Sequence, residues 1–283
     1  MKHFPAKNLC LLLLASMIWG TGFVAQAVGM DHLGPFAFNA IRSFVGGVAL
    51  IPVLLFFGRF KSAERKAEER ANRKTLLIGG LCCGLALGVA SCLQQVGMQY
   101  TTVGKAGFIT AMYIVLVPVL GLFLGKKPPK TTFFSVALAV AGLYLLSCMG
   151  VSQINKGDLY LMGCALAFSV QITCIDRLAG NLDGLRMNCI QALVVTVLSL
   201  PFILLTKESV SSSAIASCWF PLVFSGVLSM GVAYTLQIVG QKDLEPTTAS
   251  LIMSLESAFA ALGGWLILHQ TMTVWELLGC GLL

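Results

Sequence analysis

The sequence contains little charge. Asp, Glu, Lys and Arg together make up 11% of its 283 residues, whereas a soluble domain has about 25% because its surface faces water. Hydrophobic residues make up 57%, and the mean hydropathy is +0.86. At about 20 apolar residues per crossing, such a chain could cross a bilayer roughly ten times. The composition therefore argues against a soluble enzyme, a disordered chain and a secreted disulfide scaffold, and it predicts a polytopic membrane protein.

The sequence also lacks the motifs expected of metal sites and of common hydrolases. Its ten cysteines include no CxxC pair, so their spacing predicts neither a zinc site nor a disulfide framework. GxSxG and HExxH are absent, and His3, His32 and His269 lie near the ends of apolar runs. We therefore expect no cofactor, no metal and no catalytic residue. An intramembrane enzyme and a non-transporting membrane scaffold or receptor are the alternatives to transport.

The apolar residues fall into ten runs. Only helices satisfy every backbone donor and acceptor within one apolar segment of this length, so we expect an all-α fold with ten transmembrane helices. The last run is too short to span a bilayer, so either the final helix is half-length or the sequence stops before its natural end. The runs lie at about 8–28, 35–57, 75–98, 103–125, 131–149, 157–177, 187–206, 216–240, 246–268 and 271–283.

The positions of Lys and Arg predict the orientation. With the N-terminus inside, fifteen of the nineteen lie in inner connectors, and only Lys105, Lys156 and Lys207 lie in outer ones. Cytoplasmic loops carry an excess of Lys and Arg, so we expect both termini in the cytoplasm. The net charge of +7 is then a topology signal, and nucleic acid is not an expected partner. The mixed-charge stretch 61–74 is expected to be a solvated cytoplasmic helix or linker.

The N-terminus has a second interpretation, a cleavable signal peptide. Lys2 and Lys7 form a basic region, and Ala25-Gln26-Ala27 resembles a cleavage site. The apolar stretch is long for a signal peptide and includes Trp19 before that site. We therefore favour a first helix that is retained.

The chain also contains an internal repeat. A shift of 149 residues aligns Asn39 with Asn188 and Arg42 with Gln191, and a shift of 143 aligns Gln94 with Gln237. These matches predict a first half at 1–150 and a second half at 151–283, each with five helices. Because five is odd, the second half enters the membrane from the opposite side, which makes an inverted-topology repeat. Such repeats support alternating access to a site at the midplane, so transport is the expected function.

Polar groups within the spans indicate where that site lies. Ionisable residues in lipid normally face a bundle interior or a cavity. Glu256 lies in the middle of its apolar run, and Arg42 lies about two turns into its own, where a long side chain could also reach the membrane surface. Of the adjacent Gln94 and Gln95, which point about 100° apart on a helix, we choose Gln94 because Gln237 is its repeat partner. The expected substrate-binding residues are Trp19, Asn39, Arg42, Gln94, Tyr113, Gln171, Asn188, Gln191, Tyr234, Gln237 and Glu256.

Two packing features accompany these residues. Gly80, Gly84 and Gly88 form a stripe of small residues, which predicts close approach of a neighbouring helix. Pro52 and Pro201 are related by the repeat and are expected to bend their helices in the same way.

Four segments resemble the EamA-type, ten-helix branch of the drug/metabolite transporter superfamily. They are WGTGF (19–23), FNAIR (38–42), TTVGKAGFITAMYIVLVPVLGLFLGKKP (101–128) and EPTTASLIMSLESAFAALGGWLIL (245–268). The resemblance covers the whole chain as two EamA-like halves. One departure is Ser257, where the family usually has Pro, so the usual cause of a kink there is missing; another is Gln270, where the family often has Glu.

The resemblance implies a secondary transporter of small metabolites such as amino acids, often working outward. We expect Arg42 to attract a substrate carboxylate, and Glu256 to bind a substrate amine or to transfer a coupling proton. The expected partners are a small-molecule substrate and the lipid bilayer of the cell membrane. The oligomeric state stays open, with a homodimer among the options.

Overall fold

The computed structural model describes residues 6–126, 130–147, 155–180, 182–242, 244–269 and 274–282. Within these ranges the chain is helical, with no strand. The predicted boundary between the halves, at residues 150 and 151, lies outside the described residues, as does Gln270. The elements are α1 (Ala6–Met30), α2 (Pro35–Arg59), α3 (Ala63–Ala71), α4 (Arg73–Met98), α5 (Val103–Ala111), α6 (Tyr113–Phe123), α7 (Lys130–Ser147), α8 (Lys156–Leu178), α9 (Gly184–Thr206), α10 (Ser212–Ser217), α11 (Trp219–Val223), the π-helix η1 (Phe224–Ala233), α12 (Tyr234–Gly240), α13 (Pro246–Met253), α14 (Glu256–Leu268) and α15 (Val274–Leu282).

Eight helical segments are long and apolar enough to cross a membrane. They correspond to the first four and the sixth to ninth apolar runs, and three of them are assembled from shorter pieces: α5 with α6, α11 with η1 and α12, and α13 with α14. The fifth run contains a shorter apolar helix, Phe133–Gly142, within α7. The tenth run contains α15, which has nine residues. The expectation of an all-α membrane fold is confirmed, whereas ten crossings stay a prediction.

The ninth apolar run is interrupted although Ser257 replaces the family's proline. The helix tightens between α13 and α14, where the N–H of Leu255 donates to the carbonyl of Ile252 at 3.3 Å and the N–H of Ser257 donates to that of Ser254 at 3.1 Å. The Ser257 hydroxyl donates a hydrogen bond of 3.0 Å to a neighbouring helix, at the carbonyl of Gly107 in α5. Short-range backbone bonds and a serine contact to α5 therefore accompany a break in the helix at the place where the usual proline is missing.

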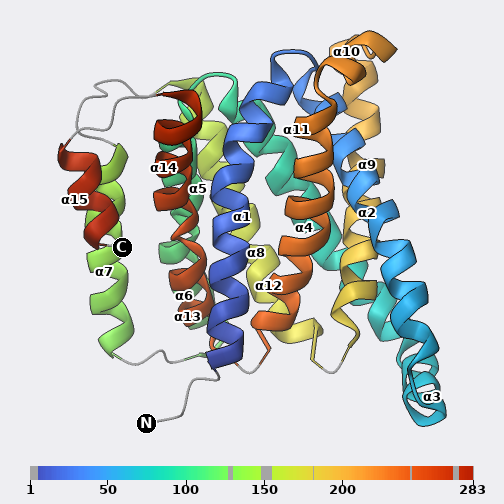
Figure 1. Ribbon diagram of the computed structural model, residues 1–283. Helices are drawn as coiled ribbons and strands as arrows, with labels where there is room; N and C mark the ends of the chain where they lie inside the picture. The colour runs from blue at the N-terminus through green and yellow to red at the C-terminus, as the bar shows by residue number, and fades with distance from the viewer. Residues whose placement is uncertain are drawn as a thin grey trace.

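The arrangement of the helices agrees with a two-part repeat. The repeat mates α2 and α9 pack against each other, and so do α7 and α15, which lie together at one edge of the bundle (Figure 1). The mates α1 and α8 run in opposite directions (Figure 1). A pseudo-two-fold axis in the membrane plane would relate helices in this way.

The glycine stripe of α4 packs on α9. A Cβ at Gly80 would lie 2.7 Å from Ile190 Cγ2, and one at Gly84 would lie 2.8 Å from Val194 Cβ. Neither distance leaves room for a methyl group, so only glycine lets the two helix backbones approach this closely. The expectation of a small-residue packing surface on this helix is confirmed.

The charged stretch 61–74 forms α3, which Ser62 caps by accepting a hydrogen bond from the N–H of Arg65 at 3.2 Å. Its residues are exposed, apart from Glu69. Glu69 is different, because its side chain is only 8% exposed and forms salt bridges with Lys61 at 2.5 Å and with Arg186 of α9 at 3.0 Å. Glu69 thus links α3 to the start of α9.

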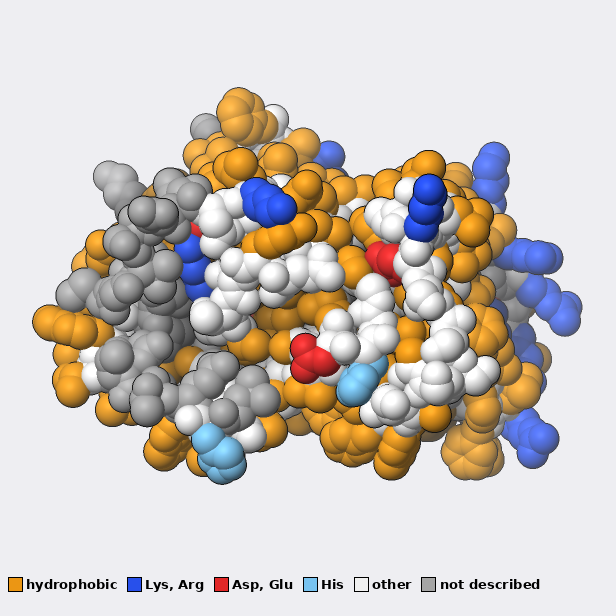
Figure 2. Space-filling view, turned by 90° about the horizontal axis from the view of Figure 1, so that it is seen from above, with side chains coloured by type: hydrophobic (Ala, Val, Ile, Leu, Met, Phe, Trp, Pro, Cys, Tyr) orange, Lys and Arg blue, Asp and Glu red, His pale blue; other side chains and the backbone are white. Residues whose placement is uncertain are grey.

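The opposite end of the bundle is seen in Figure 2, viewed from above. Hydrophobic and uncharged polar groups form most of the visible surface there, with few acidic side chains. The mixed-charge helix α3, with three acidic and three basic residues, lies at the other end, at the lower right of Figure 1. The orientation was predicted from the positions of Lys and Arg, and it stays a prediction.

Candidate functional site

A cavity lies in the centre of the bundle, where helices from both parts of the sequence meet. The cavity has a volume of about 30 Å³. This is room for about two water molecules, so an organic ligand fits only if the walls move. The lining residues are Trp19, Phe23, Gln26, Arg42, Gln94, Tyr113, Phe168, Ile172, Ser229, Tyr234, Gln237, Met253 and Glu256.

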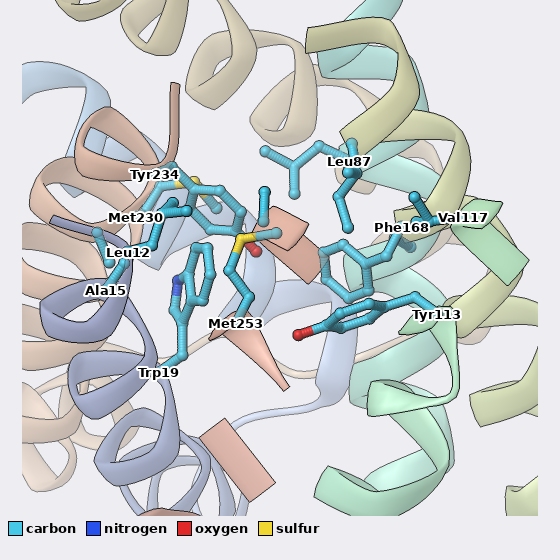
Figure 3. Packing of buried hydrophobic residues seen from close by; sticks show 14 of the residues in the cluster. Leu12, Ala15, Trp19, Leu87, Tyr113, Val117, Phe168, Met230, Tyr234 and Met253 are labelled. Atoms are coloured by element: carbon cyan, nitrogen blue, oxygen red, sulfur yellow. The ribbon is translucent and has the colours of Figure 1, made fainter. Parts of the chain in front are cut away.

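Two pairs of aromatic rings face each other across this cavity. Trp19 of α1 lies beside Tyr234 of α12, with ring centroids 4.9 Å apart and planes at 55°. Tyr113 of α6 meets Phe168 of α8 edge-on, with centroids 6.5 Å apart. Figure 3 shows Met253 between the two pairs and the Tyr113 hydroxyl pointing into the space that they enclose. The walls are therefore largely apolar, as is usual in small-molecule sites.

Arg42 brings a positive charge to this apolar space. It lies in α2 and is only 2% exposed. Its Nε and Nη2 donate to Oδ1 of Asn39 at 3.0 and 2.9 Å. Burying a charge is unfavourable unless it is paired or hydrogen-bonded, and here the bonding partner is a neutral amide.

Glu256 brings a carboxyl group to the same cavity. It is the first residue of α14, so the break after α13 places it at a helix N-terminus, where the helix dipole favours negative charge. It is 5% exposed, and its carboxyl lies near the Tyr113 hydroxyl without a hydrogen bond of normal geometry between them. Within the described ranges, neither Arg42 nor Glu256 forms a salt bridge, and no three His, Cys, Asp or Glu side chains are grouped to hold a metal.

Amide side chains connect the cavity wall to the helices behind it. Gln237 and Gln171 exchange hydrogen bonds of 3.1 and 3.3 Å, and Gln171 also donates to Oε1 of Gln191 at 3.2 Å. Gln94 lies within 3.5 Å of the Thr110 hydroxyl. The amide of Gln237 thus reaches the cavity while Gln171 and Gln191 fix its orientation from outside.

Two polar atoms of the aromatic residues have no partner among the described residues. These are Nε1 of Trp19 and the hydroxyl of Tyr113, both buried. Buried donors are normally hydrogen-bonded. The unused donors therefore indicate that the cavity receives a polar ligand or ordered water.

The structure places seven of the eleven expected residues on the cavity wall: Trp19, Arg42, Gln94, Tyr113, Tyr234, Gln237 and Glu256. The other four lie behind it. Asn39 contacts Arg42, and Gln171 and Gln191 contact Gln237 directly or through each other, as described above. Asn188 points elsewhere, because its Nδ2 donates to the carbonyls of Met230 and Gly231 in η1 at 2.9 Å each.

Six lining residues were not expected from the sequence. Two of them, Phe23 and Gln26, follow Trp19 by four and seven residues. Helical residues at these spacings share a face, so periodicity from Trp19 would have found them. The others are Phe168, Ile172, Ser229 and Met253.

Comparison with known proteins identifies transporters. The model of the EamA-like transporter family matches the chain twice, over residues 6–148 and 155–283. An uncharacterized transporter of Archaeoglobus fulgidus is 30% identical over 278 residues, which cover 96% of this chain and 82% of the relative. The threonine/homoserine exporter RhtA of Escherichia coli K12 is 28% identical over 290 residues, which cover 99% of this chain and 90% of the exporter.

A solved crystal structure shares the fold. It superposes with a TM-score of 0.77 at 17% sequence identity, and the match covers 98% of this chain and 93% of that one. Together with the eight apolar helices, the comparisons describe a multi-pass membrane protein whose relatives are named as transporters rather than enzymes.

Proposed function

This chain belongs to the EamA-like transporter family, and we propose that it is a secondary transporter that exports small organic metabolites such as amino acids. Its two inverted five-helix halves, residues 1–150 and 151–283, would open the central cavity to each side of the membrane in turn. The single observation that supports this most is the cavity itself: two charged side chains and two unused donors lie buried between helices of both halves.

The chemistry of the wall suits a small zwitterion. Arg42 would attract a carboxylate, and Glu256 would bind an amine or transfer a coupling proton. Nε1 of Trp19 and the hydroxyl of Tyr113 would donate to the substrate, and the aromatic pairs would cover its apolar part. An outward direction and an amino-acid substrate are suggested by the name of the exporter RhtA, which is similar along its length.

The structure would correspond to an occluded step of the cycle. The cavity has room for about two waters only. At the proposed outer end, Lys105 of α5 forms a salt bridge of 2.8 Å with Asp158 of α8, and at the proposed inner end Lys61 pairs with Asp183. Each pair joins the two halves, so opening either end would separate one of them.

The test is flux through purified protein in proteoliposomes. We would load the vesicles with unlabelled amino acids or other small metabolites and measure counterflow of the labelled compound, starting with L-threonine. We expect saturable flux of at least one compound, and strongly reduced flux in Arg42→Gln. No flux with any compound would contradict the proposal.

Proton coupling is tested in the same vesicles with Glu256→Gln. Glu68→Gln, on the exposed surface of α3, serves as the control. If Glu256 transfers the coupling proton, its variant loses the dependence of net flux on a pH gradient, whereas the control keeps it. An unchanged rate and pH dependence in Glu256→Gln would exclude that role.

A further inference from the structure

Asn39 and Arg42 lie one turn apart on α2 and form a two-bond contact. Nε and Nη2 of Arg42 both donate to Oδ1 of Asn39, at 3.0 and 2.9 Å. Residues three apart on a helix lie on the same face, so the contact follows from the sequence spacing. Arg42 lines the cavity, whereas Asn39 does not.

The amide of Asn39 is itself fixed by the neighbouring helices. Its Nδ2 donates to the hydroxyl of Ser91 in α4 at 3.1 Å and to that of Ser199 in α9 at 3.0 Å. All three of these residues are completely buried. Because the nitrogen faces the two serines, the oxygen faces the guanidinium; the opposite orientation would set N–H groups of the amide against N–H groups of Arg42.

The partner of Arg42 is neutral, which matters for its charge. A carboxylate at position 39 would neutralise the guanidinium, whereas an amide oxygen orients it and leaves its charge in place. No carboxylate within the described ranges forms a salt bridge with Arg42. The result is a buried cation held at two nitrogens, with its charge available to an anionic group that enters the cavity.

The repeat mate of this pair has a different arrangement. Asn188 donates to backbone carbonyls of η1, and Gln191 accepts from Gln171. Neither holds a charged group. Among the described residues, the contact between an amide and a guanidinium therefore exists at this position and not at its repeat mate.

Building on the proposed function, we propose that Asn39 is a positioning residue. It does not touch the substrate, but it holds the Arg42 guanidinium toward the cavity and keeps it uncompensated, so that the protein selects substrates with a carboxylate. The selection is expressed as a preference for an amino acid over its carboxamide.

The test compares L-threonine with L-threoninamide, and likewise every other amino acid that the wild type transports with its amide. The readouts are inhibition of flux in proteoliposomes and thermal stabilisation of the detergent-solubilised protein. Hydrogen bonds to charged groups are the stronger ones, so we expect the wild type to bind the acid about 10-fold more tightly than the amide. Arg42→Gln should lose this preference.

The decisive variants are Asn39→Asp and Asn39→Ser. Asn39→Asp keeps the acceptor but adds a negative charge, so affinity for the acid should fall about 10-fold while affinity for the amide stays nearly unchanged. Asn39→Ser keeps a shorter acceptor, and its preference for the acid over the amide should lie between those of the wild type and of Asn39→Asp. Ser43→Ala removes a buried hydroxyl next to Arg42 that has no partner among the described residues, and it should retain the wild-type preference.

The outcomes separate this inference from the proposed function. If the wild type transports a compound but never prefers an acid over its amide, or if both Asn39 variants keep the wild-type preference, the positioning role is wrong and transport stands. If Asn39→Asp does not fold, the stabilisation measurement on Asn39→Ser decides. If the wild type transports nothing, the proposed function itself is wrong.

Discussion

The Glu208 carboxylate accepts a hydrogen bond of 2.7 Å from the backbone N–H of Ala37, in the first turn of α2. Glu208 follows the C-terminal end of α9, so it joins α9 to α2 at one end of the bundle. At the other end Lys61, which follows α2, pairs with Asp183, the N-cap of α9. In both places a residue just after one of these two helices binds the start of its repeat mate. Two unrelated contacts therefore occupy equivalent positions of the repeat.

Replacing Glu208 tests the first of these contacts. Its carboxylate also accepts from the N–H of Phe36 at 3.2 Å, so it satisfies two free donors at the start of α2 and sits at the positive end of the helix dipole. We expect Glu208→Ala to lower the free energy of unfolding by about 1 kcal/mol, measured by thermal or denaturant unfolding in detergent. Ser209→Ala, at an exposed neighbour, should have no measurable effect; equal stability of the two variants would contradict the capping role.

Replacing Asp183 gives a pH-dependent prediction. Partial burial raises the pKa of this carboxyl, but the Lys61 ammonium, the N–H of Arg186 and the charge of Arg186 outweigh it, so the pKa lies below its ordinary value. A group whose pKa is lower in the folded state stabilises the fold above its unfolded pKa, about 3.9, and this stabilisation disappears as the pH falls through the folded value.

The measurement is the melting temperature of the wild type and of Asp183→Asn across pH. The difference should be constant between pH 5 and 7 and should shrink below about pH 3.9. Glu64→Gln, at an exposed position of α3, is the control and should follow the wild type throughout. A difference that grows on acidification would have the wrong sign for this account.

Two glycines of the first helix provide a matched pair. A Cβ at Gly20 would lie 2.3 Å from Cβ of Phe259 and 2.7 Å from the carbonyl oxygen of Glu256, so α1 and α14 could no longer meet. A Cβ at Gly22 would lie 3.6 Å from Oγ of Ser229, an ordinary contact. We expect Gly20→Ala to cost about 1–3 kcal/mol or more through overpacking, and Gly22→Ala to be tolerated. Equal free energies of unfolding for the two variants would contradict the close contact between α1 and α14 at Gly20.

Much of the fold follows from composition and periodicity. Apolar runs of about 20 residues have few alternatives to membrane helices, and the eight segments that meet this description lie where the runs were placed. The breaks were less predictable. The interruption before Glu256 is accompanied by a contact from Ser257 to α5, which no local pattern encodes.

The candidate site shows the same division between local and tertiary signals. Arg42 and Glu256 stood out because charge within a span is rare, and both line the cavity. Asn39 has the right spacing to share that face, but hydroxyl groups on α4 and α9 draw its amide away from the cavity. Ser229 precedes Tyr234 by five residues. A spacing of five residues brings two side chains to nearly the same face only in a helix with i→i+5 hydrogen bonds. A search at α-helical spacing from Tyr234 would therefore miss Ser229, although both line the cavity.

The central claim is that the cavity opens alternately to both sides, and side-specific labelling tests it most directly. We would place Ser229→Cys in an otherwise cysteine-free protein and expose right-side-out and inverted membranes to a charged, impermeant thiol reagent. Ser225→Cys, also buried in η1 but not on the cavity wall, is the control. The account predicts labelling of Ser229→Cys from both sides and of Ser225→Cys from neither. Labelling of Ser229→Cys from one side only, or from neither, would contradict alternating access through this cavity.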